Sequence, residues 1–444
     1  EGGDAPPRAT AMPATLLLAA TWDLGAAYDY ASVIAKEMLA TTKHVLLAPG
    51  LNLMRDPRGG RNFEYFGEDP FLTAEMAIAY VKGLQFHQVG ANLKHYVANE
   101  CDKDRHYTSS NIDERTLREV YNYPFERAIR EAEAWSVMTG NNLVDGVHVA
   151  ESRPLLKDLL RGELGYEGVI LTDWRSAYRA KESLEATLDM TTGFCEYVYG
   201  DGLLEVFQNG TLPESMLDDM ARRILTLYFR TGVVDKHREA GALATPEHKA
   251  KAREIAAEGM VLLKNEDALL PKKKWKHALV TGPGAEEAEI GTGSGLVNGG
   301  AGNIPPLEGL RAVCGEDVIT VIGDAASIER DVLEDAELVL YFANAPRGGE
   351  GDDKDSIKLS PDQVEAIRRL GRDTDRLVVI LQTGSAVDMT DWGETPRAIL
   401  VAWYGGEETG HAIADILTGK VNPSGKLPCT FGNAICDYPA GALG

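Results

Sequence analysis

Cysteine is scarce in this sequence, and the spacing of the cysteines indicates neither disulfide bonds nor a metal site. The 444 residues include five cysteines with wide spacings and no CxxC pair, namely Cys101, Cys195, Cys314, Cys429 and Cys436. An odd, scattered set argues against a disulfide framework and against a structural zinc site. The nine histidines contain no HExxH pair, so we expect no metal site.

Long apolar runs and positive charge are scarce as well. No stretch approaches the roughly 20 apolar residues that a membrane helix needs. The longest apolar runs, such as Leu16–Ala20 and Leu377–Leu381, suit buried core elements. The 45 basic side chains are outnumbered by 68 acidic ones, which gives a formal net charge of −23. Such a surface repels phosphate backbones, so we expect no nucleic-acid or membrane partner and attribute the charge to solubility.

The beginning of the sequence leaves the cellular compartment open. No signal peptide is visible, but Glu1 is not a start residue, so a processed or truncated beginning is compatible with it. Cytoplasmic, periplasmic and secreted locations therefore all stay open, and so does the oligomeric state.

Strands and helices alternate in the first half of the chain. Short apolar, β-rich segments occupy His44–Gly50, Ala91–Val97, Trp135–Gly140 and Gly168–Trp174. Segments with helical spacing lie between them, such as Phe71–Phe86 and Asp113–Ala132. The alternation predicts a parallel α/β architecture, and its length favours a (β/α)8-like TIM barrel. Only about five or six strand candidates are visible against the eight of a closed barrel, so either short strands are hidden or the barrel is incomplete at its N-terminus.

The second half predicts a separate domain, since one core seldom grows past roughly 250–300 residues. A polar segment rich in Ala and Gly interrupts the pattern near residue 232, and a helix is expected from Pro246 to about Leu263. Further strands are expected at His277–Thr281, Val318–Ile322, Leu338–Ala343, Leu377–Gln382 and Ile399–Trp403. A capping box of Ser360, Pro361 and Gln363 marks one intervening helix. We therefore predict an αβα sandwich, with domain boundaries at 1–232, 233–250 (linker) and 251–444.

Several polar residues lie at predicted strand ends, where parallel α/β domains gather their functional groups. Asp173 ends the run GVILTDW, Lys94 and His95 lie in ANLKHYV, and Asn141 follows WSVMTG. A carboxylate in the position of Asp173 is either functional or paired with a basic group, because an unpaired charge there is costly to desolvate. The residues alone leave these two interpretations open.

A second candidate carboxylate lies in the loop RGGEGDDKD, directly after a predicted strand of the second domain. Glu350 stands between Gly349 and Gly351, and small neighbours let a loop present one side chain across a cleft. A solvated charged turn is the simpler alternative. Two carboxylates that face each other from separate domains form the arrangement that glycoside hydrolysis needs.

Longer motifs show that the chain resembles glycoside hydrolase family 3, specifically its β-glucosidase branch, over essentially its whole length. Those of the first domain are LAATWD (18–23), RDPRGGRNFEYFGEDP (55–70), KHYVANE (94–100), DERTLREVY (113–121) and GVILTDW (168–174). Those of the second are GMVLLKN (259–265), GSGLVN (293–298), GGEGDDKD (348–355), NPSGKLP (422–428) and DYPA (437–440). KHYVANE differs from the KHFPGHG-like motif of the N-acetylglucosaminidases with a His–Asp dyad, which argues against that chemistry.

The resemblance implies a barrel-like domain, an αβα sandwich and an active site between them, with no cofactor. Asp173 matches the family's nucleophile and Glu350 its acid/base, and retention would place the two carboxyls about 5–5.5 Å apart. The remaining residues match positions that bind the terminal sugar, with Ser294 reaching it from the second domain: Arg61, Lys94, His95, Arg105, Trp174 and Ser294. The expected substrates are small β-linked oligosaccharides and aryl or alkyl β-glucosides.

Three departures from the family pattern stand out. A DGP-type segment that carries a sugar-binding Asp is absent near the start, and Asp4 does not take its place. Asn141, in MTGNN, stands where the family often has Tyr, and its amide is expected to bond the nucleophile. The sequence ends after DYPAGALG, where many relatives continue into a fibronectin-like domain.

An exo-acting β-glucosidase is the leading hypothesis, and the sequence is also compatible with other activities. Within the same class these are a β-xylosidase, a broad-specificity β-glycosidase and a phosphorylase on the same fold. From a different class, a non-catalytic sugar-binding protein is favoured by the absent N-terminal motif and by Asn141. The presence of both carboxylates favours an enzyme.

Overall fold

The computed structural model describes residues 9–41, 43–235, 238–296, 302–438 and 440, so Asp4 and the end of the GSGLVN motif lie outside the described residues. The chain forms two compact units that are discontinuous in sequence. The β/α unit comprises Ala27–Leu53 and Asp69–Ala242, and the sandwich unit comprises Glu1–Ala26, Met54–Glu68 and Leu243–Gly444. The boundaries at 1–232, 233–250 and 251–444 stay a prediction.

A parallel sheet of four strands forms the centre of the β/α unit. Its order is β1 (Val45–Leu46), β2 (Gly90–Tyr96), β4 (Ser136–Thr139) and β7 (Val169–Thr172), and each neighbouring pair is parallel. These are the four strands expected from the sequence. β4 and β7 are buried along their whole length, which explains why they are apolar without alternation. The described residues thus form a barrel-like sheet with half of the eight strands of a closed barrel.

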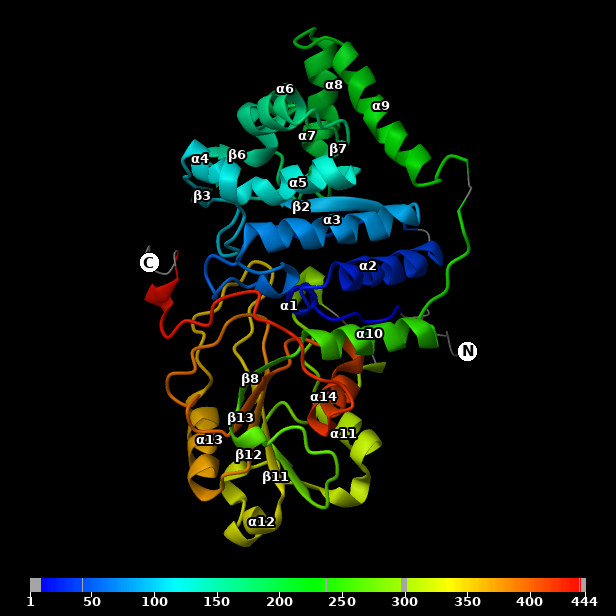
Figure 1. Cartoon of the computed structure of the whole chain (residues 1–444). Coiled ribbons are helices and arrows are strands. Elements are labelled where there is room, and N and C mark those ends of the chain that lie inside the picture. The colour runs from blue at the N-terminus through cyan, green and yellow to red at the C-terminus, as the bar shows by residue number, and fades with distance from the viewer. Residues whose placement is uncertain (1–8, 42, 236–237, 297–301, 439, 441–444) are drawn as a thin grey trace, which may run out of the picture. The chain divides into compact units, whose positions relative to one another are not determined.

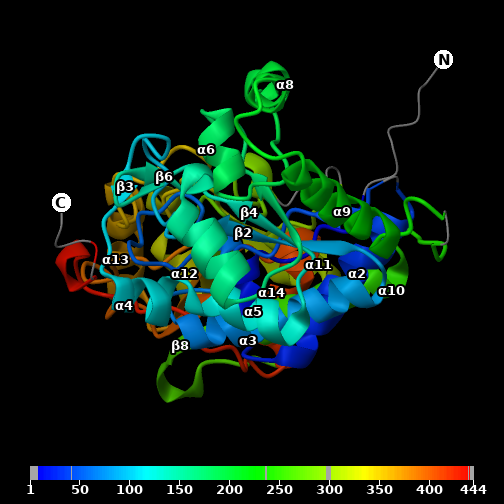
Figure 2. The ribbon, with the colours of Figure 1, turned by 90° about the horizontal axis from the view of Figure 1, so that it is seen from above.

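Helices accompany this sheet, and α3 (Pro70–Phe86) and α5 (Tyr123–Ala132) lie side by side (Figure 1, Figure 2). The predicted helix 113–132 is interrupted: α4 (Glu114–Thr116) leads into a π-wound segment at Leu117–Tyr121 before α5 begins. Pro124 lies in the first turn of α5, and its missing N–H prevents a regular helical bond at that point. The other elements are α2 (Leu24–Leu39), a π-helix at Pro154–Glu163, α6 (Ala180–Glu185), α7 (Glu196–Tyr199), α8 (Asp201–Gln208), α9 (Ser215–Arg230) and a small sheet of β3 (Ser109–Ser110), β5 (Leu143–Val144) and β6 (Val147–His148).

The sandwich unit contains a six-stranded sheet in the order β10-β9-β11-β12-β13-β8. The strands are β8 (Val261–Asn265), β9 (Ala278–Thr281), β10 (Ile319–Val321), β11 (Leu338–Asn344), β12 (Leu377–Gln382) and β13 (Ala398–Val401). All neighbours are parallel except β8, which pairs antiparallel with β13.

Helices lie on both faces of this sheet, with α13 (Pro361–Asp373) on one side and α11 (Pro306–Cys314) and α14 (Thr409–Thr418) on the other (Figure 1). Side chains of α10 (Pro246–Gly259), α11 and α14 share one apolar core with alternate residues of the strands. This is the predicted αβα sandwich. The unit also contains the short helices α1 (Thr15–Ala20) and α12 (Arg330–Asp335).

Two local predictions for this unit were wrong. The helix from Pro246 ends at Gly259 instead of about Leu263, because Val261–Asn265 pairs with β13 as an edge strand. The capping box at Ser360 does not form, although Pro361 does begin α13. The Gln363 carboxamide instead bonds the backbone N–H and carbonyl of Asn344, at 3.0 and 2.9 Å.

Candidate active site

Asp173 occupies the carboxyl end of the β/α sheet. The four residues of β7 are buried, Asp173 follows them directly, and this residue is only 4% exposed. Its backbone N–H donates to the carbonyl of Thr139, the last residue of β4, at 3.1 Å. The ladder between β4 and β7 therefore places this carboxylate.

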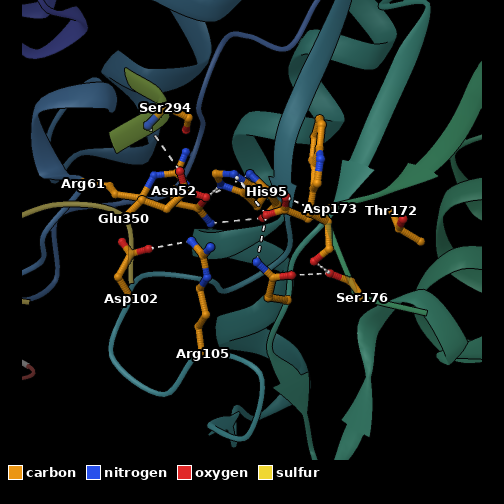
Figure 3. A network of polar contacts seen from close by, with 12 residues as sticks. Asn52, Arg61, His95, Asp102, Arg105, Thr172, Asp173, Ser176, Ser294 and Glu350 are labelled. Carbon is orange, nitrogen blue, oxygen red and sulfur yellow. Dashed lines mark hydrogen bonds and ion pairs between the residues drawn. The ribbon is translucent and has the colours of Figure 1, made fainter. Parts of the chain in front are cut away.

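Both oxygens of the Asp173 carboxylate accept hydrogen bonds. Asn141 Nδ2 donates to Oδ2 at 2.9 Å, and the backbone N–H of Trp174 donates to Oδ1 at 2.7 Å. His95 Nε2 lies 3.6 Å from Oδ2 (Figure 3). The Ser176 hydroxyl donates to Asn141 Oδ1, which leaves the Asn141 amide nitrogen directed at the carboxylate. Each carboxylate oxygen thus accepts an N–H group, as expected for an ionised carboxylate, which can only accept hydrogen bonds.

Three of the predicted sugar-binding residues of this unit, Lys94, His95 and Arg105, lie on β2 or in the loop that follows it. Lys94 is part of β2 beside His95, and it is partly buried. Arg105 lies in the loop that follows, where its Nη1 bonds Asp102 Oδ1 at 2.9 Å (Figure 3). Asp102 is buried, so this pair fixes the direction of the guanidinium.

His106 follows Arg105 and was not singled out by the sequence. Burial lowers the pKa of its imidazole, and the Arg105 charge lowers it further, whereas the Asp173 carboxylate opposes both effects. Its Nδ1 lies 3.2 Å from the Tyr178 hydroxyl. A neutral imidazole is therefore favoured at this position.

Trp174 is 44% exposed, although it directly follows buried Asp173. Gly193, with φ of +21°, lies against its indole: a Cβ on Gly193 would lie 2.2 Å from Trp174 Cδ1. The Gly193 carbonyl also accepts the N–H of Arg175 at 3.2 Å. This close approach requires glycine and determines where the indole lies.

Glu350 stands at the tip of a tight turn in the sandwich unit. Gly349 and Asp352 exchange backbone hydrogen bonds of 2.9 and 3.1 Å, and Gly351 takes a φ of +82° that favours glycine. The Glu350 side chain is 27% exposed. The backbone N–H of Ser294 donates to its Oε2 at 3.3 Å (Figure 3).

Arg61 lies near the same carboxylate, with its Nη1 4.0 Å from Glu350 Oε1. It is almost fully buried and forms a two-point pair with Glu64, in which Nε contacts Oε1 at 3.0 Å and Nη2 contacts Oε2 at 2.7 Å. Glu64 thus holds the guanidinium in one orientation.

The Glu350 loop is anchored at several points of the sandwich unit. Gly60 N–H donates to Asp353 Oδ1 at 2.7 Å, and Lys354 N–H donates to the Arg58 carbonyl at 2.8 Å. Thr292 Oγ1 donates to the Gly348 carbonyl at 2.7 Å. A Cβ on Gly60 would lie 2.3 Å from two carbonyl oxygens of the loop, those of Gly349 and Asp352. The segment around Gly60 therefore has no room for a side chain.

An ion pair between half-exposed Arg347 and buried Glu289 holds the start of this loop. Arg347 Nη2 contacts Glu289 Oε1 at 2.5 Å. Burial raises the pKa of Glu289, and the Arg347 charge and hydrogen bond oppose that shift. The loop is thus tied at both ends, and the position of Glu350 depends on contacts with segments far away in the sequence.

The structure gathers the predicted residues into one group on each unit. The β/α unit holds Asp173, His95, Asn141, Lys94, Arg105 and Trp174, and the sandwich unit holds Arg61, Ser294 and Glu350. The sequence did not reveal the residues that support them, namely Glu64, Asp102, Ser176 and Asn52. The last of these accepts the backbone N–H of His95 through its Oδ1 at 2.9 Å. Two of these were visible in principle, because Glu64 and Asp102 stand three residues from the arginines that they pair with.

The described residues contain no group of three or more His, Cys, Asp or Glu side chains that could hold a metal ion. The five cysteines all lie in the described residues, and no two of them are joined by a disulfide bond. No helix in the described ranges is both long and apolar enough to span a bilayer.

Comparison with known proteins shows two family matches that together span nearly the whole chain. Residues 2–227 match the glycosyl hydrolase family 3 N terminal domain, and residues 260–443 match the C-terminal domain of the same family. Among curated proteins, the chain is 34% identical to beta-glucosidase BoGH3A of Bacteroides ovatus and 33% identical to thermostable beta-glucosidase B of Acetivibrio thermocellus. These alignments cover 98% and 97% of this chain but 64% and 59% of the relatives, so the chain spans about three fifths of their length.

A solved structure is similar along the whole chain. Beta-glucosidase 3B from Thermotoga neapolitana, in complex with glycerol, superposes with a TM-score of 0.92 at 31% identity. The match covers 99% of this chain and 67% of that one.

Proposed function

The chain belongs to glycosyl hydrolase family 3, and on that premise we propose that it is a retaining, exo-acting β-glucosidase that removes terminal β-D-glucosyl residues. One observation carries the proposal furthest. Asp173 is a buried carboxylate at the end of β7, and both of its oxygens accept N–H groups, from Asn141 and Trp174. Such a group is oriented, and the two hydrogen bonds that it accepts favour the ionised form that a nucleophile needs.

In the first step, Asp173 attacks the anomeric carbon and forms a glycosyl ester while the glycosidic C–O bond breaks. Glu350, protonated at the start, transfers its proton to the leaving oxygen. In the second step, Glu350 as carboxylate removes a proton from water, and the water oxygen replaces Asp173 at the anomeric carbon. Two inversions restore the β configuration.

The cationic residues bind the hydroxyls of the terminal sugar in this proposal. Arg61 and Arg105 are held by Glu64 and Asp102, so their guanidinium groups are pre-oriented for binding. The terminal sugar is also bound by Lys94, His95 and the backbone around Ser294. The exposed ring of Trp174 packs against the sugar ring. The substrates are small β-linked oligosaccharides and aryl or alkyl β-glucosides, and no cofactor takes part.

The test compares the hydrolysis of p-nitrophenyl β-D-glucoside with that of the β-D-xyloside. The anomeric configuration of the first sugar released is then determined. Preferential release of β-glucose supports the proposal. Faster turnover of the xyloside would assign a β-xylosidase, and comparable rates would assign a broad-specificity enzyme. Binding of glucose without turnover of either substrate would indicate a sugar-binding protein instead.

Gly60→Ala is expected to impair the acid/base step selectively. The added methyl group would clash with the carbonyls of Gly349 and Asp352 and displace Glu350. The kcat/KM of substrates with poor leaving groups, such as cellobiose, should fall about 100-fold, while the kcat/KM of a dinitrophenyl glucoside should fall far less. Gly323→Ala is the matched control, because a Cβ at Gly323 meets nothing within 4 Å. Equal losses on both substrates would contradict this role of the loop.

Gly193→Ala is expected to weaken substrate binding through Trp174. A methyl group on Gly193 would lie within 2.4 Å of the indole nitrogen and push the ring aside. The KM for p-nitrophenyl β-D-glucoside should rise about tenfold. Gly162→Ala serves as control, because a Cβ on Gly162 would lie no closer than 3.4 Å to its nearest neighbour, the Lys157 carbonyl oxygen. An unchanged KM in folded Gly193→Ala would show that the ring does not touch the sugar.

A further inference from the structure

Asn52 is buried beside the proposed nucleophile, although no motif or comparison singles it out. It is 1% exposed and lies in the β/α unit after β1. Its segment runs along the end of β2, where Gly50 bridges to Lys94 and the Leu51 N–H donates to the Lys94 carbonyl at 2.6 Å. This pairing aligns Asn52 with His95.

The Asn52 carboxamide has only one orientation that its neighbours permit. The backbone N–H of His95 donates to Oδ1 at 2.9 Å, and Nδ2 donates to the His95 carbonyl at 3.1 Å. Nδ2 also lies 3.4 Å from Glu100 Oε1. Because a backbone N–H can only donate, the atom that faces it must be the oxygen. Three contacts to His95 and Glu100 agree on this orientation.

The same oxygen determines the tautomer of the imidazole. His95 Nδ1 lies 3.2 Å from Asn52 Oδ1, and an amide oxygen can only accept, so Nδ1 carries a proton (Figure 3). In the neutral ring Nε2 is then unprotonated, and any further proton is gained on Nε2. Nε2 is the nitrogen that lies 3.6 Å from Asp173 Oδ2.

We propose that Asn52 is a positioning residue of the active site: it holds His95 in the Nδ1–H tautomer and directs Nε2 at the Asp173 carboxylate. The inference rests on the proposed function for its catalytic consequence, but the tautomer itself does not depend on turnover. Nε2 thereby faces the nucleophile either as an acceptor for a sugar hydroxyl or, once protonated, as a cation. Without the Asn52 oxygen the ring would lose its Nδ1 partner, and the Nε2–H tautomer would become accessible.

The test combines ring nitrogen NMR with kinetics on the whole chain. Protein labelled with ¹⁵N-histidine is compared with Asn52→Leu and Asn52→Asp, and His95→Gln identifies the His95 signals. We expect a protonated Nδ1 in the wild type and in Asn52→Asp, which keeps the acceptor, and loss of that pattern in Asn52→Leu. The kcat/KM of Asn52→Leu should fall about 10- to 100-fold, with partial recovery in Asn52→Asp.

Asn92→Leu provides the matched control. Asn92 is a buried residue of β2 whose Nδ2 bonds the Ser136 hydroxyl at 2.8 Å. Its replacement should leave the His95 tautomer unchanged, which separates positioning from general loss of packing. An Nε2–H tautomer in the wild type, or an unchanged His95 pattern in folded Asn52→Leu, would overturn the proposal. Absence of glycosidase activity in the wild type would instead refute the proposed function and leave the tautomer result standing.

Discussion

Asp173→Asn is expected to lower kcat for p-nitrophenyl β-D-glucoside by on the order of 10⁴-fold. The amide cannot form the glycosyl ester, so the double displacement loses its first step. The amide also cannot present acceptors to both Asn141 Nδ2 and the Trp174 N–H, so one of these bonds is lost. Rates are measured on protein whose thermal unfolding is followed in parallel.

A covalent trap makes this prediction specific. A 2-deoxy-2-fluoro-β-glucosyl fluoride slows both steps, and its good leaving group restores the first one, so the ester should accumulate on Asp173. Peptide mass spectrometry should find the adduct in the wild type and not in Asp173→Asn. Asp158→Asn is the control, since this residue is exposed and its ion pair with Arg153 is long, at 3.8 Å. An adduct on another carboxylate would refute the assignment of Asp173.

Glu350→Ala is expected to lower kcat/KM about 10²- to 10⁴-fold for substrates with poor leaving groups, because their departing oxygen needs a proton. A dinitrophenyl leaving group needs none, so its release in the first step should be nearly unaffected. The second step then becomes slow, since no carboxylate activates water. Azide, which needs no base, should restore turnover and yield β-glucosyl azide.

Asp352→Asn tests whether any change in this loop has the same effect. The turn uses the backbone of Asp352, whose N–H and carbonyl pair with Gly349, so the side chain is free to vary. The variant should keep wild-type rates on both classes of substrate. Failure of azide to rescue Glu350→Ala, or an equal loss on both leaving groups, would move the acid/base role to another residue.

Many of the strands could be predicted from the sequence because their signals are local. β4 and β7 are buried along their whole length in a parallel sheet, and this environment favours apolar runs without alternation. The predictions failed where a distant segment competed with a local preference. Val261–Asn265 forms a strand because it pairs with β13. Gln363 bonds the backbone of Asn344 instead of forming the predicted capping box.

By itself the sequence determined the family, the plan of two α/β domains, and the positions of Asp173 and Glu350 at a strand end and in a glycine-rich loop. Only the tertiary structure decided what orients them. Asn141 reaches Asp173 across 32 residues, Asn52 reaches His95 across 43, and Gly60 reaches Asp353 across 293. The pairing of parallel strands and the docking of loops join residues that are far apart in the sequence. The spacing of residues along the chain therefore does not predict these contacts. They arise when the sheets bring strand ends and loops together.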